Sequence, residues 1–154
     1  LRPVELFRAI GDQVRGRLME AFRWRRGEWA FVRGARSHEE TFPMGQDPYE
    51  LLRDAACEAH LEEIESVLDP LRERVLERCS DGPPLTAFRL DSSWVQPLEA
   101  VSGDTTLGGL FARETASGAD LEPAYRALYL GLACGLVRTK VSPSEMPFRA
   151  SFSA

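Results

Sequence analysis

The chain has 154 residues and a net charge of -5, enough for one compact core or for two small packed units. Hydrophobic residues make up 44% and charged residues 28%, which excludes a disordered chain, and no apolar run approaches the roughly 20 residues of a membrane span. The three cysteines are scattered through apolar stretches, which favours reduced thiols over a disulfide framework. We therefore expect a cytoplasmic globular protein without a membrane span.

Charge is distributed unevenly along the chain. Residues 1–36 hold nine Arg against four acidic residues, whereas residues 37–83 hold four Arg against thirteen acidic residues. These segments either neutralise each other inside one domain, which we favour, or present a charged surface to a partner. All basic residues except Lys140 are Arg, a bias that indicates a high-GC bacterial genome. The chain opens at Leu1 without an initiator Met, so we expect a piece of a larger protein.

The first elements predicted are a helix and a hairpin. Apolar residues recur every three or four positions over residues 4–24, which predicts an amphipathic helix. Over residues 22–32 aromatic residues alternate with charged or small ones around Arg26-Gly27, which predicts a short β-hairpin.

A second helical region begins at Asp47-Pro48, where Asp47 is expected to cap the helix and Pro48 suits its first turn. This helix is expected to continue to Leu68. Asp69-Pro70 then interrupts it and starts another helix through Leu76, and residues 80–84 form the clearest linker.

After the linker the pattern predicts a strand, three helices and a strand, which is the order of a winged helix-turn-helix unit. The strands are expected at residues 85–90 and 136–141, and the helices are expected to start at Ser92-Ser93, Thr105 and Asp120, the last ending at Gly135. The predicted fold class is α+β and mostly α. We expect a helix–hairpin–helix unit over residues 1–82, a winged-helix-like unit over residues 83–141, and a tail or linker over residues 142–154.

Enzymatic motifs are absent from the sequence. It holds no glycine-rich phosphate loop, nucleophile elbow or Cys-x-x-Cys pair, and His38 and His60 are its only histidines. Cys57 and His60 lie three positions apart on a predicted helix, but no second Cys or His pair completes a zinc site. We therefore expect no catalytic residues, no cofactor and no metal.

Nucleic acid is the obvious ligand of a winged helix, yet the candidate recognition helix over residues 120–134 argues against it. Only Arg126 is basic there, against Asp120 and Glu122, whereas base and phosphate contacts need Arg, Lys, Asn or Gln. The basic residues lie on the predicted hairpin instead. Trp, Tyr and Arg are enriched in protein-binding hot spots, so we expect Arg23, Arg25 and Arg26 to contact a partner.

The hairpin also carries a resemblance to a known family. Phe22, Trp24, Gly27, Trp29 and Phe31 fill a Phe-x-Trp-x-x-Gly-x-Trp-x-Phe pattern that resembles the closing part of PATAN domains, the PatA N-terminal type of bacterial response regulators. The β-rich first half of a full PATAN domain has no counterpart in this chain. The resemblance implies a non-catalytic adaptor in phosphorelay signalling, in a family with some members that control type IV pilus motility.

Together these features predict a non-enzymatic protein–protein interaction module in bacterial signalling, in two-component or motility regulation. Its partner is another protein, and a homodimer is a variant of this interpretation. The alternative is a transcriptional regulator that binds nucleic acid through the basic N-terminal hairpin.

Overall fold

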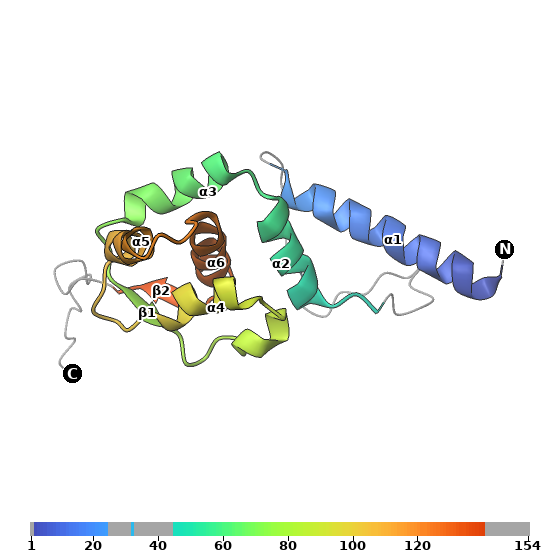
Figure 1. The fold of residues 1–154 in the computed structure, drawn as a ribbon. Coiled ribbons are helices and arrows are strands. Elements are labelled where there is room, and N and C mark those ends of the chain that lie inside the picture. The colour runs from blue at the N-terminus through green and yellow to red at the C-terminus, as the bar shows by residue number, and fades with distance from the viewer. Residues whose placement is uncertain (1, 25–31, 33–44, 141–154) are drawn as a thin grey trace, which may run out of the picture. The chain divides into compact units, whose positions relative to one another are not determined.

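A computed structural model describes residues 2–24, 32 and 45–140. The chain divides into two compact units, Leu1–Ala59 (unit 1) and His60–Ala154 (unit 2). Over the described ranges it has six α-helices and one two-stranded sheet (Figure 1). The predicted α+β, mostly α class is therefore confirmed.

Unit 1 contains the helices α1 (Pro3–Phe22) and α2 (Pro48–Glu58), which pack on each other. Their first turns follow from local chemistry: Glu5 accepts a hydrogen bond from the Arg2 backbone N–H at 3.0 Å, and Asp47 accepts one from the Tyr49 backbone N–H at 2.9 Å. The predicted helix over residues 4–24 and the predicted cap at Asp47 are confirmed. The hairpin predicted over residues 22–32 lies mostly outside the described residues.

The helix predicted to run from Pro48 to Leu68 is two helices. The first, α2, ends at Ala59, whose backbone is extended, and α3 (Leu61–Leu68) begins after His60. Asp69-Pro70 interrupts the chain as predicted, but it starts only a single 3₁₀ turn, η1 (Asp69–Leu71).

The helix expected through Leu76 is wrong, because that residue opens the strand β1 (Leu76–Arg78). It pairs antiparallel with β2 (Val137–Thr139), and Leu76 lies opposite Thr139. On its other side the Leu76 N–H donates to the Thr105 carbonyl at 3.2 Å. Backbone partners on both sides outweigh the local helical pattern, and the pairing joins residues on either side of the boundary expected at residue 82.

The strand predicted at residues 85–90 is also wrong. This segment forms a 3₁₀ turn, η2 (Leu85–Phe88), which ends at Arg89 in the left-handed region with φ of 50°. Phe88 is fully buried, so the alternation of apolar residues reflects one anchored aromatic ring rather than a pleated strand. The strand expected at residues 136–141 is confirmed in its central part as β2.

Three further helices of unit 2 lie where the sequence predicts them. These are α4 (Ser92–Glu99), α5 (Leu107–Ala116) and α6 (Glu122–Ala133). Thr106 caps α5 by accepting from the Gly109 N–H at 3.1 Å, and Gly135, with φ of 69°, follows α6 as predicted. The winged-helix assignment of residues 83–141 stays a prediction.

The core of unit 2 is built around α6, which packs against α3, α4 and β2 (Figure 1). Half of the residues of α6 are buried, among them Leu128 and Gly131. A Cβ on Gly131 would lie 2.6 Å from Leu98 Cδ2 and 3.0 Å from Val137 Cγ2, so α4 and β2 approach the helix at this position because it lacks a side chain.

We expect the substitution Gly131→Ala to lower the free energy of unfolding by about 1–3 kcal/mol, because the added methyl group overpacks a filled site. Urea unfolding followed by circular dichroism measures this change. Ala133→Ser, on an exposed position of the same helix, should stay within about 0.5 kcal/mol of the parent protein. Equal stability of the two variants would contradict the close packing at Gly131.

Candidate functional site

One side of α1 is anchored to α2 by polar contacts. The Arg15 guanidinium donates to the Asp54 carboxylate, and the Arg23 guanidinium donates to Glu58 at 2.7 Å. Gln46 Nε2 donates to the Gly11 carbonyl at 3.3 Å. Two of these contacts join the basic first segment to the acidic second one, which is what mutual neutralisation predicts.

A neighbouring face of α1 carries an apolar seam, which shares Gly11 with the anchored side. Its members alternate at spacings of three and four residues, the heptad pattern that places side chains on one face of a helix. This α1 seam consists of Val4, Phe7, Gly11, Val14, Leu18 and Ala21. A helix of 20 residues is about 30 Å long, so the seam offers nearly three heptads for contact.

Much of the seam and its borders is exposed. The exposed fraction rises from 40% for Leu18 to 77% for Val4, with Phe7 at 50% and Phe22 at 51%. Ile10 and Val14, in the middle of the helix, are partly covered. Aligned apolar side chains exposed in this way are typical of surfaces that bind other proteins.

Arg side chains border the seam on both sides. Arg8 and Arg15 occupy positions along one edge and Arg17 lies along the other, while the acidic residues of α1 lie on the far side of the helix. Arg15 is neutralised by Asp54. Arg8 and Arg17 are exposed and form no ion pair with any residue that the structure describes.

Of the residues expected to contact a partner, only Arg23 is described. Its side chain is 68% exposed, but its guanidinium is engaged by Glu58 within unit 1. Arg25 and Arg26 lie outside the described residues, so the expected cluster of three stays a prediction. The seam was foreseeable as an amphipathic pattern, but periodicity does not reveal whether a neighbouring element covers it.

The candidate recognition helix of unit 2 offers little free charge. Its single cation, Arg126, is 14% exposed and pairs with Glu122 at 2.8 Å. The buried residues of α6 face α3, α4 and β2 rather than solvent. This helix is a core element.

A polar and aromatic cluster ties η1 to α5 and α6. The Arg72 guanidinium donates to Asp69 and to the Tyr125 hydroxyl, both at 2.8 Å, and lies 5.6 Å from the centre of the Phe111 ring. Phe111 and Tyr125 stack with ring centres 4.1 Å apart. The hydrogen bond with Asp69 is the main reason why the pKa of Arg72 is raised. Because both rings are buried, we assign the cluster a role in stabilising unit 2.

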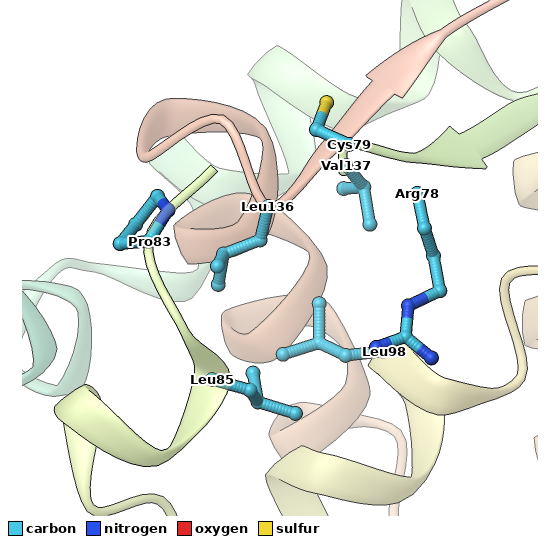
Figure 2. Close-up of a pocket in the computed structure, with 7 residues that line it drawn as sticks. All are labelled: Arg78, Cys79, Pro83, Leu85, Leu98, Leu136 and Val137. Atoms are coloured by element: carbon cyan, nitrogen blue, oxygen red, sulfur yellow. The ribbon is translucent and has the colours of Figure 1, made fainter. Parts of the chain in front are cut away.

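A small pocket lies between β1, η2, α4 and β2 (Figure 2). The side chains of Leu85, Leu98 and Leu136 converge on it, and Arg78 extends along its rim, while the Cys79 sulfur points away. Its volume of about 50 Å³ accommodates only a few water molecules. The pocket therefore fits neither a nucleotide nor a metabolite.

The cysteines of the described chain form no disulfide. Burial raises the pKa of the Cys134 thiol, which disfavours the nucleophilic thiolate. Within residues 2–24, 32 and 45–140, no group of three or more His, Cys, Asp and Glu side chains is arranged to hold a metal ion.

Comparison with known proteins returned no matching family model, curated protein or solved structure. Over the described part of the chain, every helix is too short or too polar to cross a membrane.

We expect Tyr125→Phe to lower the free energy of unfolding by about 0.5–1.5 kcal/mol, because Arg72 loses a hydrogen-bond acceptor. Thermal or urea unfolding tests this expectation. Tyr129→Phe, which removes the hydroxyl of a half-buried neighbour on α6, is the matched control and should change stability by less than about 0.5 kcal/mol.

The thiols should differ in reactivity. At about pH 8, iodoacetamide is expected to alkylate the exposed Cys57 faster than Cys134, whose burial disfavours the thiolate. Timed quenching followed by peptide mass spectrometry measures both rates in one sample. Equal rates in the native protein, rather than only in urea, would show that Cys134 is not protected.

Proposed function

We propose that this chain is a non-enzymatic protein–protein interaction module and that its docking surface is the α1 seam. The observation that carries this proposal is the exposure of Val4, Leu18 and Phe22 along one side of a helix. Burying a large apolar side chain contributes about 1.5–3 kcal/mol, so a few such anchors supply the centre of an interface.

The rest of the described chain supports binding rather than catalysis. The pocket beside Leu85, Leu98 and Leu136 is too small for a metabolite, and the polar cluster at Arg72 is occupied by its own partners. Chemistry on a substrate needs a cavity with convergent polar groups. The α1 seam is instead an elongated apolar surface, exposed towards both ends and partly covered in its middle, of the kind that binds a helix.

The cellular role we propose is bacterial signalling, in two-component or motility regulation. The support is the resemblance of the segment from Phe22 to Phe31 to the closing part of PATAN domains. Arg23, Arg25 and Arg26 follow the end of α1 in the sequence, and we retain them as predicted contacts of the partner. Cytoplasmic location belongs to the same proposal.

The proposal predicts that Leu18→Asp and Val4→Asp each abolish capture of the partner. A buried carboxylate without a counter-ion makes an apolar interface unfavourable. The full chain serves as bait in nuclease-treated lysate of the source bacterium, and captured proteins are identified by mass spectrometry. Gln13→Asp places the same charge away from the seam and should retain the partner.

Circular dichroism confirms that each bait is folded, and Val4, at 77% exposed, is a site where Asp is not expected to unfold the helix. Retention of the same partner by both seam variants would overturn the proposal. Capture that depends on intact nucleic acid and falls steeply with salt would support the alternative, a nucleic-acid-binding regulator.

A further inference from the structure

We infer that the α1 seam binds an acidic amphipathic helix of another protein: a segment with apolar residues at heptad spacing and Asp or Glu beside them. The inference rests on the proposed function and specifies the partner's chemistry. It follows from the residues that border the seam, where Arg8 and Arg17 are exposed.

Shape comes first. The helix that carries the seam is about 30 Å long, and exposed apolar side chains lie towards both of its ends, Val4 near one and Leu18 and Phe22 near the other. A second helix laid along it meets all of these anchors at repeats of three and four residues.

Charge then selects the kind of helix. Position by position, the edges of the seam hold Arg8 and Arg15 on one side and Arg17 on the other, with no carboxylate among them. Because Asp54 already neutralises Arg15, Arg8 and Arg17 are the two cations left for a partner. Carboxylates of a docked helix at the facing border positions would pair with them, one on each side.

A second copy of the chain does not fit this pattern. Two α1 seams packed together would bring Arg borders against Arg borders and leave no carboxylate to neutralise them. An anionic membrane fits less well too, because the side of α1 opposite the seam carries Glu5, Asp12 and Glu20. Helices that lie on membranes carry mostly Lys and Arg on that side.

The test uses two synthetic helical peptides of about three heptads. Both have Leu at the seam-facing positions; one has Glu and the other Lys at the border positions. Fluorescence anisotropy measures the binding of each peptide to the full chain. We expect the Glu peptide to bind about tenfold more tightly than the Lys peptide, and this preference should shrink as salt is raised.

Charge reversal sharpens the test. In the double variant Arg8→Glu/Arg17→Glu the preference should invert, so that the Lys peptide binds more tightly. The matched control reverses charge away from the seam, in Asp12→Arg/Glu20→Arg, and should keep the original preference. A scrambled Glu peptide, with equal composition but no heptad spacing, should not bind.

Each other outcome overturns the inference. Equal binding of the two peptides, lost in Leu18→Asp, would leave the proposed docking surface standing but remove its acidic partner. Binding unaffected by Leu18→Asp would remove both. If neither peptide binds, an acidic helix is rejected as the partner. The lysate experiment then decides whether the seam is a docking surface. If the chain forms a dimer that Val4→Asp dissociates, the seam binds a second copy of the chain instead. If the chain binds vesicles of phosphatidylserine and phosphatidylcholine more tightly than the Glu peptide, the seam binds a membrane instead.

Discussion

The close approach of α4 and β2 to α6 at Gly131 constrains most of unit 2. Leu98 and Val137 reach the helix backbone there because no Cβ intervenes, and the partners of α6 occupy its buried side. A helix used in this way has little surface left for recognition. Its one cation, Arg126, is turned to Glu122 on the same helix. The packing that stabilises unit 2 therefore takes up half of the residues of α6, and the one cation of the helix is paired.

Unit 1, in contrast, leaves apolar side chains of α1 exposed. Its two helices are joined on one side of α1 by Arg15, Gln46 and Arg23 contacts that are partly or largely open to solvent. Exposed ion pairs contribute little stability, about 0–1 kcal/mol each, and small units bury only a modest fraction of their apolar surface. The apolar side of α1 consequently keeps much of its exposure, and further burial against a partner is favourable. This surplus of exposed apolar surface links the architecture of unit 1 to binding.

The sequence predicted best what depends on neighbouring residues. Asp47 caps α2 through its own first turn, and Gly135 takes a left-handed conformation that few other residues adopt. Sequence-based prediction failed where contacts with distant segments determine the secondary structure. Leu76 looks helical locally, but Thr105 and Thr139 make it a strand, and residues 85–90 alternate like a strand but fold around Phe88. The α1 seam falls between these cases, because its period is local whereas its exposure depends on what packs nearby.

The distribution of charge along the chain also points to the α1 seam. The excess of Arg in the first segment looks like a footprint for nucleic acid, but Arg15 and Arg23 are engaged by Asp54 and Glu58 of α2. What remains on α1 beside the seam is Arg8 and Arg17, two cations separated by an apolar strip. A polyphosphate backbone needs cations along a continuous track, whereas a helix with an apolar centre and acidic edges meets both cations and the strip at once. On the part of α1 that the structure describes, the spacing of the free charges therefore agrees with the protein partner that we propose.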